Sequence, residues 1–183
     1  MDNGASSYRR DLNGDEPAFH ELVKEYFDSL VFFIDRYTSD TAAAEDIAID
    51  VFTYLVVNKH RYNFRVSMKT YLFMLGRSRA LDYIRRRNRM PMAELTEAEQ
   101  VPADGPSPEE IVLADQRKRA VNAALEQLRD ELRLAVHLVY FEQLQPQEAA
   151  KILKKTPKQM YNLLYRAKEQ LRTILGEEGE LYL

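Results

Sequence analysis

Residues 146–175 read PQEAAKILKKTPKQMYNLLYRAKEQLRTIL, and they predict two short helices separated by a tight turn. Thr156 and Gln159 have the spacing of a capping box, in which the threonine hydroxyl and the glutamine side chain each accept a hydrogen bond from a free amide at the helix start. Pro157 suits the first helical position, where a missing N–H costs nothing. The second helix therefore begins after Thr156, and the first is opened by Pro146. Two helices joined by a three-residue turn are the skeleton of a helix-turn-helix.

The second helix of this pair has two distinct faces. Apolar residues recur at three- and four-residue spacing and predict one buried stripe: Met160, Leu163, Leu164, Ala167, Leu171 and Ile174. The other side gathers amide, phenol and basic groups, which reach base edges and phosphates: Lys158, Gln159, Tyr161, Asn162, Tyr165 and Arg166. An ordinary amphipathic helix would also carry a solvated polar face, but the turn and the cap favour DNA contact. Lys154 stands where such turns often place glycine, so we expect a less comfortable backbone there.

Composition excludes several classes of protein. The 183 residues are 45% hydrophobic, which is enough for the cores of one or two small domains. Because there is no cysteine, disulfides and thiolate metal sites are impossible. His20, His60 and His137 share no ligand-like spacing, so we expect no metal and no other cofactor. No apolar run is long enough to span a bilayer and no signal peptide is evident, so we expect a cytoplasmic protein without membrane insertion.

The charges are distributed unevenly although the net charge is only −3. Residues 61–89 are strongly basic, with Asp82 as the only acid, and residues 151–172 are basic as well. Residues 94–115 contain acids and neither lysine nor arginine. Two basic blocks separated by an acidic connector predict two separate contacts with nucleic acid. The near-neutral total suggests weak nonspecific binding by the free protein.

The hydrophobic pattern is helical on both sides of a Pro-containing segment, and no strand alternation is convincing. We therefore expect an all-α fold of two small helical domains joined by a flexible acidic linker, with the helix-turn-helix in the C-terminal domain. The expected divisions are an N-terminal extension at 1–16, a first domain at 17–89, the linker at 90–108, a second domain at 109–175 and a tail at 176–183.

The helix expected after residue 41 carries a second kind of surface. Its sequence AAAEDIAIDVFTYLVV places one apolar stripe toward the core, while Ile49, Val56 and Val57 fall beside Asp46, Asp50 and Thr53. Aliphatic side chains mixed with acids on an exposed face suggest a protein-docking surface. The alternative is a central helix buried on both sides, against which the carboxylates argue.

Residues 58–73, NKHRYNFRVSMKTYLF, interleave aromatic and basic side chains. Single-stranded nucleic acid is held in this way, with bases stacked on rings and phosphates near cations. The alternative is that the rings belong to the core and the cations to its solvated rim. The arginine run at 85–89 can follow a duplex backbone, and its presence favours the nucleic-acid interpretation.

These segments together resemble the extracytoplasmic-function (ECF) group of bacterial sigma factors. The similarity is carried by AEDIAIDVF at 44–52, TYLFMLGRSRALDYIRRR at 70–87 and the terminal helix-turn-helix with YRAKEQLRTIL at 165–175. It covers about residues 17–89 and 109–175. The resemblance implies a dissociable RNA polymerase subunit that selects promoters and helps open them, with no catalytic site of its own.

The resemblance also implies roles for individual residues. The polymerase-docking residues would be Asp46, Ile49, Asp50 and Thr53, facing the clamp coiled coil of the largest subunit. The −10 element would be read and melted by Arg61, Tyr62, Asn63, Phe64, Lys69, Tyr71, Arg85, Arg86, Arg87 and Arg89. The −35 element would be read by Thr156, Lys158, Gln159, Tyr161, Asn162, Tyr165 and Arg166. Implied partners are core RNA polymerase, including its flap, promoter DNA and an anti-sigma factor.

The chain departs from the family pattern at several positions. Ile49 stands where glutamine is common, Tyr71 where tryptophan is usual and Ser78 where asparagine is usual. The recognition helix has Tyr161-Asn162-Leu163 in place of a frequent Lys-Ser-Arg. The promoter sequence of relatives therefore does not transfer to this chain.

Two other functions fit parts of the sequence. A stand-alone helix-turn-helix regulator of operator DNA would explain the second domain but leave the basic-aromatic first domain without a role. A helical adaptor without a DNA role would need neither basic block. An enzyme fits least, because no nucleophile constellation or phosphate-cradling glycine loop is present.

Overall fold

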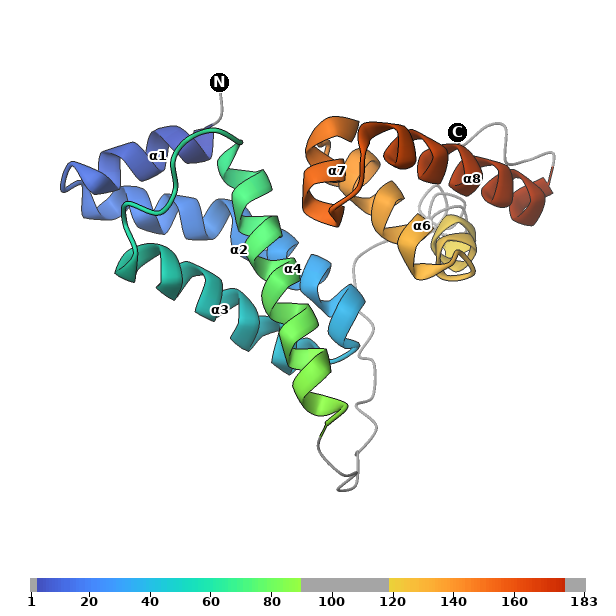
Figure 1. The fold of residues 1–183 in the computed structure, drawn as a ribbon, viewed down its shortest axis with the longest axis horizontal. Helices are drawn as coiled ribbons and strands as arrows, with labels where there is room; N and C mark the ends of the chain where they lie inside the picture. Colours follow the sequence, from blue (N-terminus) through green and yellow to red (C-terminus); the bar gives the residue numbers. More distant parts are fainter. Residues whose placement is uncertain (1–2, 90–118, 177–183) are drawn as a thin grey trace, which may run out of the picture.

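The structure is a computed structural model, and it describes residues 3–89 and 119–176. Within those ranges the regular elements are helices, with no strand, as expected from the sequence (Figure 1). The first module contains α1 (Asn3–Leu12), α2 (Glu16–Thr38), α3 (Thr41–Val57) and α4 (Met68–Arg87). The second contains a helix at 119–126, then α6 (Asp130–Val136), the π-helical turn η1 (His137–Phe141), α7 (Pro146–Leu153) and α8 (Pro157–Leu175). The expected linker and most of the tail lie outside the described residues.

The helices of the first module begin and end where short polar side chains allow it. Ser39 ends α2 in the left-handed region at φ 49°, and Asp40 then caps α3 by accepting a hydrogen bond from the Ala43 amide at 3.0 Å. Ser67 caps α4 by accepting from the Thr70 amide at 3.2 Å. The three long helices that these caps bound pack against one another (Figure 1).

The core of the first module lies where α2, α3 and α4 meet. Its fully buried side chains include Leu22, Leu30, Phe33, Ile34, Val51, Leu55, Leu72 and Phe73. The rings of Phe33 and Phe73 lie 4.8 Å apart. At Gly76 a β-carbon would come within 2.9 Å of Leu30 Cδ1, so glycine allows α4 to approach α2 closely. This core holds α4 rigidly, and α4 carries several of the expected DNA-binding residues.

A helix at residues 3–12 was missed by the sequence analysis, which treated residues 1–16 only as an extension. α1 packs along α2, and its Tyr8 is fully buried. The Tyr8 hydroxyl donates to the carbonyl oxygens of Leu55 and Lys59, at 3.2 and 2.9 Å. The N-terminal segment is therefore part of the first module.

The helix-turn-helix forms as the sequence predicts. The Thr156 amide donates to Gln159 Oε1 at 2.8 Å and the Gln159 amide donates to Thr156 Oγ1 at 3.2 Å, which completes the capping box. Lys154 ends α7 at φ 55°, in the left-handed region, which confirms the less comfortable backbone expected at this position of the turn. The predicted stripe on α8 is buried apart from Leu164, which is half-buried, and Ile174, which is 37% exposed.

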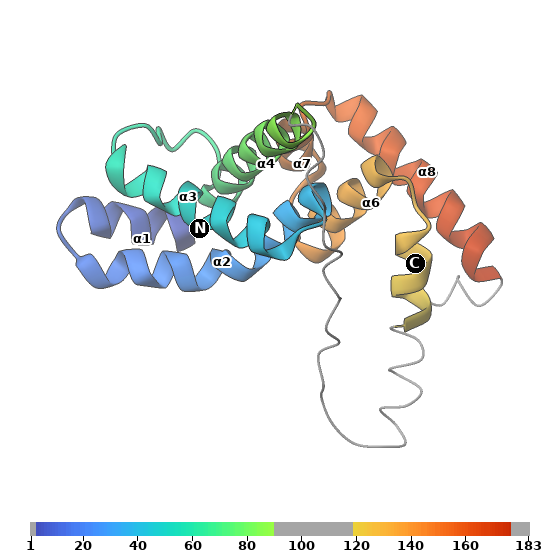
Figure 2. The same cartoon turned by 90° about the horizontal axis from the view of Figure 1, so that it is seen from below.

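The two modules contact each other through the first turn of α4, a feature absent from the sequence-based expectations (Figure 2). Lys69 Nζ lies 2.6 Å from Glu142 Oε2 and donates to the Glu142 carbonyl oxygen at 2.9 Å. Glu148 Oε1 accepts from the hydroxyls of Ser67 and Thr70, at 3.0 and 3.2 Å. Carboxylates are favoured at this place because a helix N-terminus carries partial positive charge.

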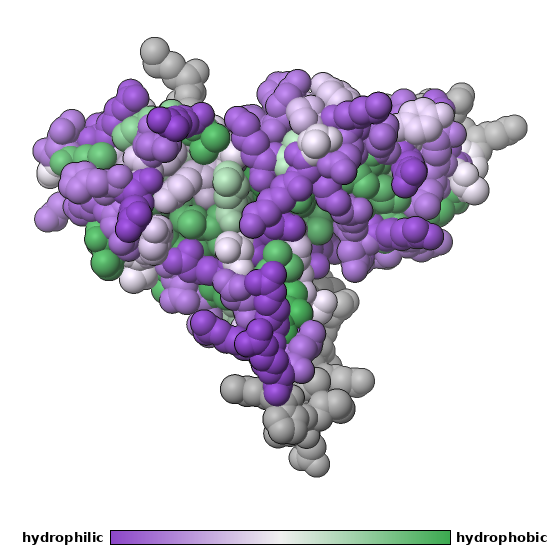
Figure 3. Space-filling model, viewed as in Figure 1, coloured by the Kyte–Doolittle hydropathy of each residue, from purple (hydrophilic) through white to green (hydrophobic). Residues whose placement is uncertain are grey.

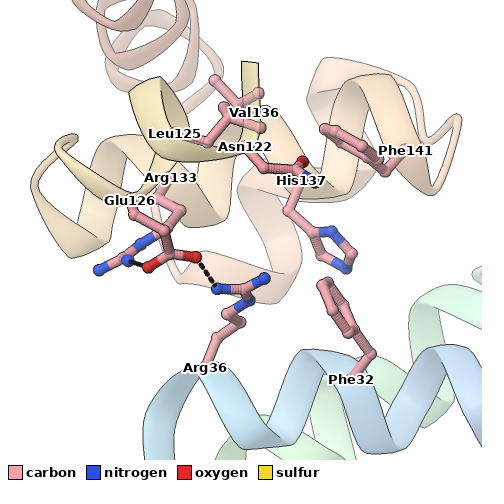
Figure 4. A pocket seen from close by; sticks show the side chains of 9 residues that line it. All are labelled: Phe32, Arg36, Asn122, Leu125, Glu126, Arg133, Val136, His137 and Phe141. Atoms are coloured by element: carbon pink, nitrogen blue, oxygen red, sulfur yellow. Dashed lines mark hydrogen bonds and ion pairs between the residues drawn. The ribbon is translucent and has the colours of Figure 1, made fainter. Parts of the chain in front are cut away.

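A second contact lies beside the first, around a cavity of about 230 Å³ between α2 and the C-terminal module (Figure 4). Glu126 stands between Arg36, at 2.5 Å, and Arg133. The ring of Phe32 faces that of His137, with centroids 5.0 Å apart. The interface therefore contains both ion pairs and an aromatic contact, which lie side by side.

Glu142 is the most buried charge of this interface. Burial raises its pKa, but the Lys69 ammonium at 2.6 Å and His137 Nε2 at 3.3 Å outweigh burial and hold the pKa below its ordinary value of 4.5. A depressed carboxyl pKa in the folded state means that ionisation stabilises the fold. That stabilisation is complete above the ordinary value and is lost as pH falls through the folded-state pKa.

We expect Glu142→Gln to lower the free energy of unfolding at pH 7 by about 1–3 kcal/mol, because Lys69 and His137 lose a charged acceptor. The difference from the wild type should shrink as pH falls below the ordinary glutamate value of 4.5. Chemical denaturation between pH 7 and pH 3 measures it. Glu169→Gln, which alters an exposed pair with Arg172, is the control and should change stability by less than about 1 kcal/mol. A deficit that stays constant down to pH 3 would show that Glu142 acts by packing.

Candidate nucleic-acid interface

The outer face of α8 presents the side chains expected to read duplex DNA. All seven are exposed: Thr156, Lys158, Gln159, Tyr161, Asn162, Tyr165 and Arg166. Lys158, Asn162 and Arg166 are spaced by four residues, so they form a row along one side of the helix. Tyr165 is 67% exposed, which is unusual for a large ring without a partner surface. The arrangement offers donors, acceptors and planar groups on a single exposed helix.

The start of α8 is held by the same residues that close its cap. The Gln159 side-chain oxygen is used by the Thr156 amide, and Gln147 Nε2 donates to the Tyr161 hydroxyl at 3.4 Å. Beside this end, Lys155 pairs with Glu131 at 2.5 Å, along the edge of a shallow hollow that Asn162 and Arg166 also line. The helix N-terminus and these donors together favour an anionic ligand.

Aromatic residues of the 58–67 loop and α4 form one cluster in the first module. Tyr62 lies at its centre, 4.6 Å from the Phe64 ring and 5.0 Å from the Tyr71 ring. Only 3% of Tyr62 is exposed, and its hydroxyl donates to the Val66 carbonyl oxygen at 2.7 Å. Tyr62, which was expected to contact the −10 element, is therefore buried, and its ring supports the loop from inside.

The rim of the same loop is accessible. Phe64 and Tyr71 are half-buried, whereas Arg61, Asn63 and Arg65 are exposed. Phe64 has φ 59°, a region that bulky residues seldom occupy. Burial raises the pKa of Tyr71, so its phenol stays neutral and able to donate at physiological pH. Half-buried rings edged by exposed amide and guanidinium groups suit stacking with unpaired bases.

The remaining basic residues of α4 divide into engaged and exposed groups. Lys69 is engaged by Glu142, as described above. Arg85 pairs with Asp82 at 3.0 Å, and Arg87 donates to the Thr38 carbonyl oxygen at 3.2 Å. Hydrophilic side chains gather over the C-terminal end of α4 (Figure 3), where Arg85, Arg86, Arg87 and Arg89 are all exposed. This end is a basic surface of the kind that follows phosphates.

The outer face of α3 carries the mixed surface expected for protein docking. Ile49 is 53% exposed and Val57 is 74% exposed, while Asp46, Asp50 and Thr53 are also exposed. The alternative of a helix buried on both sides is therefore wrong. Among described residues, no cluster of three His, Cys, Asp or Glu residues could hold a metal ion, and no helix could cross a membrane.

Four features that shape these surfaces were missed by sequence reasoning: Glu142, His137, Glu148 and α1. Glu142 and His137 are separated in sequence from their partners on α4 and α2, and no local pattern indicates those contacts. Glu148 did carry a signal, because a glutamate at the third position of the helix opened by Pro146 is the acid of a capping box. α1 carried the weaker signal of a short amphipathic pattern.

Comparison with protein families places both modules in one family. The model described as "Sigma-70 region 2" matches residues 22–90, and that described as "Sigma-70, region 4" matches residues 118–171. Together the two matches cover more than half of the chain.

Relatives of known type match nearly the whole chain. The ECF RNA polymerase sigma factor SigE of Mycolicibacterium smegmatis is 29% identical over 173 residues, covering 92% of this chain and 67% of the relative. The ECF RNA polymerase sigma factor SigW of Bacillus subtilis is 26% identical over 172 residues, covering 90% and 92%.

Two solved structures share the fold. The sigma factor RpoE from Bartonella quintana, in complex with the anti-sigma factor NepR, superposes with a TM-score of 0.66 at 19% identity, covering 87% of this chain and 97% of the other. CnrH, in complex with the cytosolic domain of CnrY, superposes with a TM-score of 0.60 at 18% identity, covering 94% of each chain.

Proposed function

The chain belongs to the ECF group of sigma-70 family sigma factors, which direct RNA polymerase to promoters, and we propose how its two modules divide the promoter between them. The C-terminal module reads the −35 element as duplex, and the first module reads the −10 element once it is unpaired. The observation that supports this most is the existence of two exposed basic surfaces, on α8 and on α4, in a chain of net charge −3. Charge concentrated at two places provides two phosphate contacts without a general attraction to DNA.

At the −35 element, the row formed by Lys158, Asn162 and Arg166 enters the major groove. An α-helix fits this groove, and amide and guanidinium groups can each make two hydrogen bonds to a base edge. Thr156 and Gln159 hold the helix start against the phosphate backbone. Tyr161 and Tyr165 add apolar contact at the edge of the same surface.

At the −10 element, unpaired bases stack on the rim of the aromatic cluster. Phe64 and Tyr71 offer partly exposed ring faces, Asn63 offers an amide, and Arg61 stands near the path of the phosphates. The bases lose their stacking in the duplex and regain it against protein, which offsets part of the cost of opening. Tyr62 keeps the loop in shape from within the core.

The arginine run at the end of α4 follows the phosphates next to the opened segment. Arg86 and Arg89 are exposed. Arg85 and Arg87 hold only a surface ion pair and a carbonyl contact, which a phosphate can replace at small cost. The basic surface thereby anchors duplex DNA next to the site of strand opening.

The mixed face of α3 docks on core RNA polymerase. Ile49 and Val57 give buriable apolar area, and Asp46, Asp50 and Thr53 give polar contacts around it. The clamp coiled coil of the largest polymerase subunit is the partner for this face, and the flap is the partner of the C-terminal module. The protein works in the cytoplasm and has no catalytic site of its own.

Promoter binding requires the two modules to separate. Lys69 cannot contact −10 DNA while Glu142 holds its ammonium group, and Ser67 and Thr70 are bound by Glu148 in the same state. An anti-sigma protein that holds the modules together would keep Lys69, Ser67 and Thr70 engaged by the second module and away from −10 DNA. The complex of RpoE with the anti-sigma factor NepR supports this proposal, because a protein of this fold is bound by an anti-sigma factor there.

Runoff transcription tests the function as a whole. Purified core polymerase is offered a promoter library with and without the full chain. Initiation at a defined pair of elements only when the chain is present supports the proposal. Tight, sequence-specific duplex binding without polymerase, and no effect on initiation, would instead support a stand-alone regulator.

We predict that Arg86→Ala lowers open-complex formation more than it lowers binding to core polymerase. Because a phosphate contact is lost, the plot of log binding constant against log salt concentration should become less steep by about one. Permanganate reactivity of unpaired thymines measures opening, and titration with labelled core polymerase measures docking. Arg129→Ala, an exposed arginine outside both basic surfaces, serves as the control. Equal losses of opening and docking in Arg86→Ala would contradict the division of roles.

We predict that Asn162→Ala and Lys158→Ala have different effects at the −35 element. Asn162→Ala should relax discrimination at one base pair by about 1–3 kcal/mol, because a base-edge contact is lost. Lys158→Ala should weaken all −35 sequences similarly, because a phosphate contact carries no sequence information. Competition among promoter variants for holoenzyme distinguishes the two. If both substitutions weakened binding to all −35 sequences equally, α8 would contact only the phosphate backbone of the DNA.

A further inference from the structure

α1 lies directly beneath the 58–67 loop, which is proposed to read the −10 element. The match to region 2 begins at residue 22, after α1 ends. The Tyr8 hydroxyl donates to the last turn of α3 at Leu55 and to the start of the loop at Lys59. A 3.8 Å ion pair between Asp11 and Lys59 adds a second link. α1 therefore contacts both the last turn of α3 and the start of the loop that follows it.

The ring of Tyr8 continues the aromatic cluster of the loop. Its centroid lies 5.8 Å from that of Tyr62, in an edge-on arrangement, and 6.5 Å from that of Phe64. Edge-on and tilted contacts of this kind stabilise aromatic clusters beyond simple burial. They help to hold Phe64 at its positive φ, which costs energy and persists only when neighbours enforce it.

Arg9 extends this cluster to the surface. Its guanidinium carbon lies 4.6 Å from the centroid of the Phe64 ring, and the side chain is exposed. None of the described carboxylates forms an ion pair with Arg9. The next residue, Arg10, is different: it pairs with Asp15 at 2.6 Å and with Glu21 at 2.8 Å. Two adjacent arginines of one helix thus have opposite environments, one neutralised by acids and one lying on an aromatic ring.

A guanidinium lying on a ring offers two kinds of contact to nucleic acid. Its flat face can stack on a base, and its N–H groups can bind a phosphate in pairs. Arg61 and Arg65 are exposed on the same loop, so a strand that stacks on Phe64 also meets a basic rim. No acid beside Arg9 would have to be displaced when DNA binds.

We propose that Arg9 is a DNA contact for the unpaired −10 strand, and that α1 positions it over Phe64. The inference rests on the proposed −10 role of the loop. Arg9 adds affinity for the single strand and not base preference, because stacking and phosphate contacts are tolerant of sequence. Tyr8 is a positioning residue that acts through Phe64 and Tyr62.

The test uses holoenzyme assembled from core polymerase and the full chain, titrated with a fluorescent single-stranded oligonucleotide that carries the non-template −10 sequence. Arg9→Ala should weaken this affinity about fivefold, as expected for loss of a cation–π and phosphate contact. Arg10→Ala removes the same charge from the same helix and should leave the affinity unchanged. Arg9→Met covers the Phe64 ring without charge, and it should weaken binding and lower the salt dependence as Arg9→Ala does.

Each alternative outcome has a distinct meaning. If Arg9→Ala and Arg10→Ala lowered the affinity for the oligonucleotide equally, the effect would come from net charge alone, and the proposal would be overturned. Wild-type affinity in Arg9→Met would show that Arg9 only shields Phe64, which also overturns it. Phe64→Ala separates this inference from the proposed function. If Phe64→Ala weakens single-strand binding and Arg9→Ala does not, only the role of Arg9 fails; if neither does, the −10 role of the loop fails as well. Unchanged melting temperatures for the Arg9 variants exclude unfolding.

Discussion

The first turn of α4 is the position on which the arrangement of the molecule depends. The hydroxyls of Ser67 and Thr70 donate to Glu148 of the second module, and the Lys69 ammonium pairs with Glu142. The same helix is fixed from behind by its close approach to α2 at Gly76. α4 therefore belongs to the core of one module, carries residues proposed to bind DNA and forms the contact with the other module. Any change at this turn affects stability, domain arrangement and DNA access together.

The contact is suited to opening because it combines carboxylates with groups that also bind phosphate. Glu142 is stabilised as an anion by His137 and Lys69, at the cost of burial. Buried pairs of this kind gain little net stability, since desolvation offsets attraction. The phosphates of a DNA strand are anions like these carboxylates, and they remain accessible to water. Docking of α3 on polymerase would supply further free energy.

Four described residues other than glycine have positive φ, namely Ser39, Phe64, Gln143 and Lys154, and two of them lie in segments proposed to read the promoter. Lys154 in the turn of the helix-turn-helix and Phe64 in the −10 loop both have positive φ without being glycine. In each case neighbouring structure holds the residue: the cap of α8 follows the first, and the rings of Tyr8 and Tyr62 surround the second. Such residues fix a loop in one shape before its ligand arrives. The backbone of these two proposed DNA-binding segments is therefore held in one shape by its neighbours.

The sequence alone determined the all-helical fold, the caps at Thr156 and Gln159, the exposed face of α3 and the faces of α8, because each depends on residues a few positions apart. It did not determine which aromatic residues face outward, so Tyr62 was expected at the surface and lies in the core. It also could not show α1 beneath the loop or Glu142 against Lys69. Those contacts join residues dozens of positions apart, and local periodicity carries no information about them. Only packing of whole helices decided which charges are neutralised, as for Arg10, and which remain exposed, as for Arg9.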